Sequence, residues 1–175
     1  LQYFPSKNLH NLEYYQLDDF VEESLITDDS VNIKVWFKAP RNKAKILVYL
    51  QGNAGNLGDR AHKFRFFTDN SDYGILAVSY RGYGNSEGSP SEDGLLKDAK
   101  AATDFLKSKG YNNKDVILYG ESLGSGVAVR HAIEFDPHSL ILEAPFYSAV
   151  TIAQRGYWYL PVNLLMRDRF DSHVI

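Results

Sequence analysis

Apolar residues along this chain gather in short continuous runs separated by polar segments. Three runs are KILVYL at 45–50, GILAVSY at 74–80 and DVILYG at 115–120, and a fourth, SLILEAP, covers 139–145. Runs of this length, rich in β-branched and aromatic residues, are typical of strands covered on both faces of a parallel sheet. We therefore expect four buried strands.

Helical patterns fill the intervals between these runs. The stretch SPSE at 89–92 offers a serine cap, a proline at the first helical position and a glutamate at the third. Apolar residues then recur at spacings of four, three and four, on one helical face: Leu95, Ala99, Ala102 and Leu106. Gly110 marks the stop of this helix. Further helices are expected near 59–68 and 125–134, so strands and helices alternate.

The two ends of the chain differ from this alternating centre. Residues 1–43 contain two alternating segments around a turn at 28–30, which predicts antiparallel strands at the edge of the sheet. Residues 44–150 form the parallel core. Residues 151–175 are aromatic without a clean period, and we expect a helical segment over the sheet. The prediction is a single α/β domain over 1–175, with helices on both faces of a mostly parallel sheet.

Composition narrows the function classes. With 44% hydrophobic residues and a net charge of −3, the chain is globular and has no basic surface, so nucleic acid is not expected as a partner. It has no cysteine, and its five histidines show no metal-ligand spacing, so we expect neither a metal nor another cofactor. No apolar run approaches the ~18 residues of a membrane span. The first residue is Leu1, which suggests a chain cut from a longer one.

The stretch GESLG at 120–124 has the pattern G-x-S-x-G after an apolar run and before a helix. In that context the pattern is typical of a serine nucleophile on a tight strand-to-helix turn. Ser122 is therefore the candidate nucleophile. The alternative is a glycine-rich turn whose serine only caps the helix.

A second loop, GNAGN at 52–56, follows an earlier strand of the same sheet. An oxyanion hole needs a backbone N–H from such a loop and another from the residue after the nucleophile. The candidate donors are the backbone N–H groups of Asn53 and Leu123. A phosphate-binding loop is the rival interpretation, which would make this a nucleotide-binding domain, although the glycine spacing is G-x-x-G-x-x-G and no G-K-[ST] is present.

Four blocks in order carry a family resemblance: QGNAGN, SYRGYGNSEGSPSEDG, YGESLGSGVAV and LILEAPFYS. Together they resemble the α/β-hydrolase superfamily, and more narrowly its membrane-associated serine hydrolases, which include protein depalmitoylases. The resemblance implies Ser122 as nucleophile and the backbone of Asn53 and Leu123 as oxyanion hole. Gln51 stands where relatives usually have histidine. Relatives also carry an N-terminal anchor just before a stretch like LQYFPS.

A catalytic base is harder to find. In this fold the acid and then the histidine follow the nucleophile in the chain. His10 and His62 precede it; His131 lies roughly 13 Å along the helix at 1.5 Å per residue. His138 immediately precedes the last strand, at the opposite end of the sheet. Only His173 leaves the geometry open.

The sequence offers one candidate for the catalytic acid, with two possible roles. Glu143 is the only carboxylate at the carboxyl end of a strand after Ser122, and it either orients a base or is a buried, hydrogen-bonded structural group. We interpret Asp168 and Asp171 as solvated or helix-terminal charges. We expect the acid and histidine to lie outside this chain, which would then be the N-terminal part of a hydrolase without its last strands. The strand at 139–145 would be an exposed edge that favours self-association.

The predicted function is hydrolysis of a carboxylic ester or thioester, on a small molecule or an acylated protein, by an enzyme whose isolated chain is severely impaired. The alternative from another class is a non-catalytic remnant that binds an acyl group or a partner in the same cleft. The aromatic stretch GYWYLP at 156–161 either lines an acyl pocket or completes the core. The sequence leaves the cellular location open.

Overall fold

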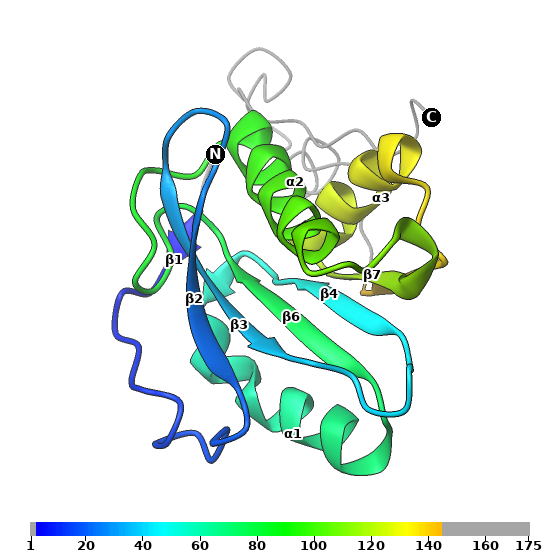
Figure 1. The fold of residues 1–175 in the computed structure, drawn as a ribbon. Coiled ribbons are helices and arrows are strands. Elements are labelled where there is room, and N and C mark those ends of the chain that lie inside the picture. Colours follow the sequence, from blue (N-terminus) through cyan, green and yellow to red (C-terminus); the bar gives the residue numbers. More distant parts are fainter. Residues whose placement is uncertain (1–2, 145–175) are drawn as a thin grey trace.

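The chain folds around one mixed sheet with helices on both faces (Figure 1). The structure is a computed structural model, and it describes residues 3–144. The spatial order of the main sheet is β2 (Val21–Ile26), β3 (Asn32–Lys38), β6 (Gly74–Ser79), β4 (Ile46–Leu50), β7 (Val116–Glu121) and β8 (Ser139–Glu143). β6, β4, β7 and β8 run parallel, and β2 and β3 join them as an antiparallel hairpin.

The helices divide between the two faces of the sheet. A short 3-10 turn, η1 (Leu57–Arg60), leads into α1 (Ala61–Asn70), which covers one face. The opposite face carries α2 (Glu92–Ser108) and α3 (Leu123–Phe135), which pack against each other, while η2 (Asn113–Asp115) precedes β7. Each face has its own apolar core, because alternate residues of a strand point to opposite sides. The mostly parallel sheet with helices on both faces, predicted from the sequence, is confirmed.

The inner strands are buried as the apolar runs predict, whereas β8 is not. β4 and β6 have no exposed residue. β8 ends at Glu143, and within the described residues it pairs only with β7. Its apolar side chains at 140–142 are therefore between 36 and 41% exposed.

The starts of all three helices differ by two residues from the sequence prediction. α1 begins at Ala61 because residues 57–60 form η1. α2 begins at Glu92, because Ser91 has extended dihedrals and its hydroxyl accepts a hydrogen bond from the backbone N–H of Gly94. Pro90 therefore precedes the helix, and its ring lies against Gly82. α3 begins at Leu123, two residues earlier than expected, because the chain reverses at Ser122 alone.

The first residues of the described chain form a strand that the pattern did not predict. β1 (Phe4–Pro5) pairs in parallel with β5 (Ala54–Gly55), a two-residue strand inside the glycine-rich loop after β4. The predicted hairpin follows, with its turn at 28–30. The helical segment expected at 151–175, with His173, Asp168 and Asp171, lies outside the described residues.

Candidate functional site

The two motif loops meet at a point where the chain diverges. β4 and β7 are neighbours, with Leu50 beside Gly120. From β4 the chain crosses through α1 to β6 on one side, and from β7 it crosses through α3 to β8 on the other. In open α/β sheets such a switch point forms the crevice in which ligands bind. We call residues 51–56 the 51–56 loop and residues 120–124 the 120–124 turn.

Ser122 occupies the reversal between strand and helix. Its φ of 49° and ψ of −110° are rare for a residue with a side chain. Its backbone N–H donates to the carbonyl of Glu143 over 2.9 Å. The hydroxyl makes no helix-capping hydrogen bond and has no hydrogen-bond partner within residues 3–144. The alternative of a serine that merely caps α3 is therefore not what the structure shows.

The glycines of the turn are required by close backbone packing. A Cβ on Gly124 would lie 1.9 Å from the carbonyl oxygen of Leu50, and one on Gly120 would lie 2.5 Å from the carbonyl oxygen of Gly124. No side chain fits at such distances. The turn is thus pressed directly onto the end of β4, where the 51–56 loop begins.

Asn53 is held from two sides. The Tyr83 hydroxyl donates to the carbonyl oxygen of Asn53 over 2.8 Å and contacts its Oδ1 at 3.0 Å. The same Oδ1 accepts from the backbone N–H of Phe4 over 3.2 Å. Leu123 is the first residue of α3, where backbone N–H groups have no acceptor within the helix. The oxyanion roles of Asn53 and Leu123 remain predictions.

A cluster of charged and phenolic groups lies beside the turn, on the α1 face. Glu121 accepts hydrogen bonds from Arg60 over 3.1 and 3.2 Å and from the Tyr49 hydroxyl, and Lys63 lies 3.5 Å away. Burial opposes ionisation of Glu121, but the bonds from Arg60 and Tyr49 outweigh it and lower its pKa. Glu121 is therefore an anion at neutral pH. It is not a proton donor.

Glu143, the predicted acid candidate, belongs to the same cluster. Lys63 donates to both of its carboxylate oxygens over 2.8 Å, and the Tyr119 hydroxyl donates to Oε2 over 2.8 Å. The hydrogen bond from Lys63 is the main cause of its lowered pKa. Within residues 3–144, no histidine contacts this carboxylate. Glu143 is hydrogen-bonded as the structural alternative requires, but its side chain is 39% exposed and not buried, so its role stays a prediction.

The histidines of the described chain have other surroundings. His131 contacts the Thr103 hydroxyl at 3.0 Å and stacks on Phe135, and burial lowers its pKa to about 4. His10 stacks on Tyr14, and both His62 and His138 are exposed. Across residues 3–144, none of these four is hydrogen-bonded to the candidate nucleophile.

Gln51 is the residue at which this sequence differs from the pattern of the family it resembles. It is fully buried at the end of β4, and neither amide atom of its side chain has a hydrogen-bond partner in the described chain. The histidine usual at this position is absent, yet the loop keeps its path through contacts at Asn53 and beyond.

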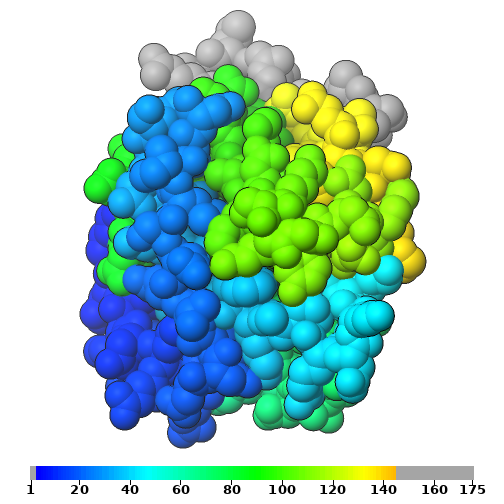
Figure 2. All heavy atoms as spheres, viewed as in Figure 1, coloured from blue at the N-terminus to red at the C-terminus, as the bar shows by residue number. Residues whose placement is uncertain are grey.

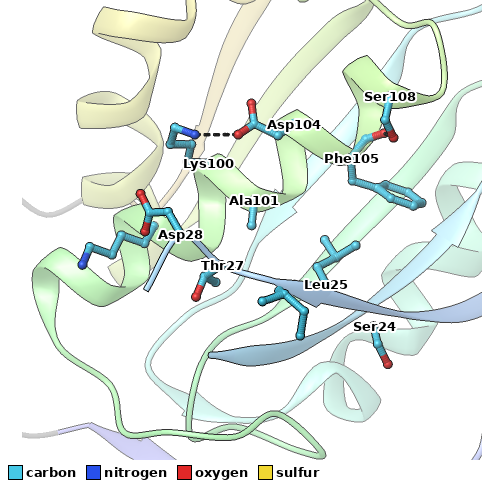
Figure 3. A pocket seen from close by; sticks show the side chains of 11 residues that line it. Ser24, Leu25, Thr27, Asp28, Lys100, Ala101, Asp104, Phe105 and Ser108 are labelled. Carbon is cyan, nitrogen blue, oxygen red and sulfur yellow. Dashed lines mark hydrogen bonds and ion pairs between the residues drawn. The ribbon is translucent and has the colours of Figure 1, made fainter. Parts of the chain in front are cut away.

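A hollow in the described surface lies elsewhere. A cavity of about 420 Å³ lies between β2 and α2, with Thr27 and Phe105 on its two walls and the Lys100–Asp104 ion pair at its rim (Figure 3). Figure 2 shows the blue hairpin and the green helix α2 meeting on that face. None of the predicted site residues lines it. The described residues include no group of three His, Asp or Glu side chains suited to a metal.

Sequence reasoning missed two residues that touch the 51–56 loop. Tyr83 stands inside the block SYRGYG, so its position was a signal, although its contact with Asn53 was not. The position of Arg60 gave no signal, because a charged residue between a loop and a helix is usually exposed to solvent. The indication came from its partner: Glu121, at the second position of G-x-S-x-G, needs a cation nearby when it is buried.

Comparison with known proteins identifies the family. A family model described as serine aminopeptidase, S33 matches residues 41–167. The chain belongs to this family of α/β-hydrolases. It is 41% identical over 108 residues to Lysophosphatidylserine lipase ABHD12 of Xenopus tropicalis, covering 58% of this chain and 28% of that protein. It is 37% identical to the membrane protein YNL320W of Saccharomyces cerevisiae, covering 71% of this chain and 45% of that protein.

Solved structures agree on the fold. The Pyrococcus furiosus esterase Pf2001 superimposes with a TM-score of 0.74 at 21% identity, over 92% of this chain and 66% of that one. The chain spans less than half the length of the curated relatives described above. No helix within residues 3–144 is long and apolar enough to cross a membrane.

Proposed function

We propose that this chain carries the nucleophile and oxyanion half of a serine hydrolase acting on carboxylic esters or thioesters. The observation that carries the proposal is Ser122, whose hydroxyl has no hydrogen-bond partner within residues 3–144 and lies on a constrained turn beside the 51–56 loop. A side chain that neither caps the helix nor bonds its surroundings is available for a substrate. Holding it at a φ of 49° costs stability without an evident structural return.

The reaction follows from these parts. The Ser122 oxygen attacks the substrate carbonyl, its proton passes to a base, and the carbonyl oxygen becomes an anion. Backbone N–H groups of Asn53 and Leu123 stabilise that anion. Collapse expels the alcohol or thiol with a proton and leaves an acylated serine, which water then hydrolyses. The esterase and lipase among the similar proteins support an ester substrate.

We further propose that the base and its acid come from outside residues 3–144. The four histidines in that range have the other surroundings described above, and Glu143 is bound to Lys63. If the base also lies outside residues 145–175, residues 1–175 alone are severely impaired. Without a triad, only about 10³- to 10⁴-fold acceleration over water remains from the oxyanion hole and binding.

A fluorophosphonate probe tests this proposal, with Ser122→Ala as the control. We expect slow labelling, complete only at long times, and confined by mass spectrometry to Ser122. Labelling that persists in Ser122→Ala contradicts the nucleophile. Rapid stoichiometric labelling of the wild-type chain contradicts the impairment but keeps the nucleophile.

A non-catalytic acyl-binding role is the second candidate, and it is favoured because no histidine within residues 3–144 is hydrogen-bonded to Ser122. An acyl group or a partner would then occupy the same crevice without reacting. A fluorescent fatty acyl ligand that binds with equal affinity to wild-type and Ser122→Ala chains, together with no labelling by the probe, would support this role over hydrolysis.

Self-association through β8 is a further proposal about partners. Within residues 3–144, β8 pairs only with β7, and its apolar side chains at 140–142 are 36 to 41% exposed. Unpaired edges favour strand pairing with a second copy. We expect a dimer by sedimentation at micromolar concentration, and Ile141→Lys should shift it to monomer. A wild-type chain that sediments as a clean monomer contradicts this proposal.

Any attachment to a membrane would, we propose, use a part of the protein outside residues 3–144. The name of the yeast relative supports an association with membranes.

A further inference from the structure

Arg60 connects the two loops of the site. Its Nη1 donates to the carbonyl oxygens of Ala54 over 2.7 Å and Asn56 over 3.1 Å, both in the 51–56 loop. Its Nε and Nη2 donate to the carboxylate of Glu121 over 3.2 and 3.1 Å. One guanidinium thus binds the loop that carries Asn53 and the residue that directly precedes Ser122.

The connection is compact and nearly closed to solvent. The side chain of Arg60 is 10% exposed and that of Glu121 is 18% exposed. A Cβ added to Gly52 would lie 3.1 Å from Glu121 Oε1 and 3.2 Å from Arg60 Nη2. The ion pair therefore packs against the backbone just before Asn53. A shift of the pair would shift that backbone with it.

We propose that Arg60 is a positioning residue, which uses Glu121 to hold the 51–56 loop at a fixed distance from the 120–124 turn. This inference rests on the proposed function, because the distance matters when Asn53 and Leu123 must bind one oxygen atom together. Donors in an oxyanion hole act within about 2.7–3.1 Å of that atom, so a misplacement of ~1 Å costs about 10²-fold in rate.

The chemistry of the side chain fits this task. Arginine presents five N–H donors in a planar fork, which lets one group bind a carboxylate on one edge and carbonyls on another. Lysine has a single nitrogen and cannot reproduce both edges. Arg60→Lys therefore keeps the charge beside Glu121 while losing part of the geometry.

Lys63 provides a matched control on the same helix. Its ammonium lies 3.5 Å from Glu121 and 2.8 Å from Glu143, so its removal also takes one positive charge from the cluster. Among the described residues it has no hydrogen bond to the 51–56 loop. Lys63→Met should disturb the charge balance of the cluster and leave the loop in place.

The first experiment is amide hydrogen exchange on the chain of 175 residues, with Arg60→Met, Arg60→Lys and Lys63→Met. We expect exchange in residues 52–57 to be at least tenfold faster in Arg60→Met, intermediate in Arg60→Lys and unchanged in Lys63→Met. Equal protection of this segment in Arg60→Met and Lys63→Met overturns the proposal. If Arg60→Met fails to fold, Glu121→Gln replaces it, because the amide is isosteric and weakens the same bonds.

The second experiment measures acylation of Ser122 by p-nitrophenyl acetate, from the release of p-nitrophenolate after subtraction of the Ser122→Ala rate. We expect Arg60→Met to lower the limiting acylation rate about 10- to 100-fold with little change in the ester concentration at half-saturation, and Arg60→Lys to recover part of it. Lys63→Met should stay within about threefold of wild type. Equal rates in the two methionine variants count against the positioning role.

The two hypotheses fail in different ways. If Ser122→Ala releases p-nitrophenolate as fast as wild type, the proposed function is wrong, and the exchange experiment still decides whether Arg60 holds the loop. If Ser122 is required but Arg60→Met acylates like Lys63→Met, the function stands and the positioning role is wrong.

Discussion

The 120–124 turn and the 51–56 loop lie side by side at the switch point of the sheet but are held by different means. The turn is fixed by its own backbone: Gly120 and Gly124 pack at distances that exclude a side chain, and α3 begins at once. The loop is fixed by side chains and a short strand from elsewhere in the chain. Tyr83, Arg60 and the strand β1 each hold a separate part of it.

This difference means that the two sides respond to different changes. The close backbone contacts at Gly120 and Gly124 leave no room for adjustment, so a side chain added at either glycine affects the whole fold. A loop held by separate hydrogen bonds can lose one of them and shift locally, because each bond contributes only about 1 kcal/mol. Stability should therefore report on the turn, and reaction rates should report on the loop.

The largest expected effect is that of Gly124→Ala. The new Cβ would lie 1.9 Å from the carbonyl oxygen of Leu50, so β4 and α3 must separate. We expect the free energy of unfolding in urea to fall by about 3 kcal/mol or more. Gly110→Asn is the control, since Gly110 has a φ of +90° but nothing within 4 Å, and asparagine tolerates positive φ better than most residues. Equal losses in the two variants would contradict the packing argument.

A smaller effect on stability, with a clearer effect on rate, is expected for Tyr83→Phe. The change removes the bonds to the oxygens of Asn53 and leaves the buried ring in place. The free energy of unfolding should fall by about 1 kcal/mol. The Ser122-dependent acylation rate should fall about tenfold, because the 51–56 loop loses one of its attachments. Tyr73→Phe, at a half-exposed position, should change neither quantity.

The smallest expected effect is a pH dependence confined to the loop. The pKa of Glu121 is lowered in the folded chain, so its ionised form contributes stability that is present above the ordinary glutamate pKa of about 4.3 and is lost as pH falls through the folded value. Arg60, Lys63, Tyr49 and Glu143 face this carboxylate.

Below about pH 4 we therefore expect exchange in 52–57, corrected for intrinsic rates, to increase before exchange in α3 does. Glu121→Gln should remove this difference between the two segments. An unchanged difference in that variant would assign the effect to another carboxylate.

The turn could be predicted from the sequence because its causes are local. The apolar run, the two glycines and the serine lie within nine residues, and their spacing alone places Ser122 between a strand and a helix. The same holds for the buried strands β4 and β6. The start of α2 nevertheless differs by two residues from the prediction. Ser89 and Ser91 are both possible N-caps, and the sequence pattern does not distinguish them.

The loop could not be predicted, because its causes are distant in the chain. Arg60 and Glu121 are 61 positions apart, and Phe4 and Asn53 are 49 apart. Hydrophobic periodicity is a local signal and contains no information about pairs of residues this far apart in the chain. The ion pair of Glu143 with Lys63 has the same origin, which is why its sequence position alone left two roles open.

Ser122 holds a φ of 49° that glycine would adopt without steric cost, so we expect the Ser122→Gly variant to be more stable than the wild-type chain. A library of variants of this chain, sorted only for resistance to heat or protease, should therefore enrich glycine at position 122. The same library sorted for reaction with an ester would keep serine. The two selections would separate what this position contributes to folding from what it contributes to chemistry.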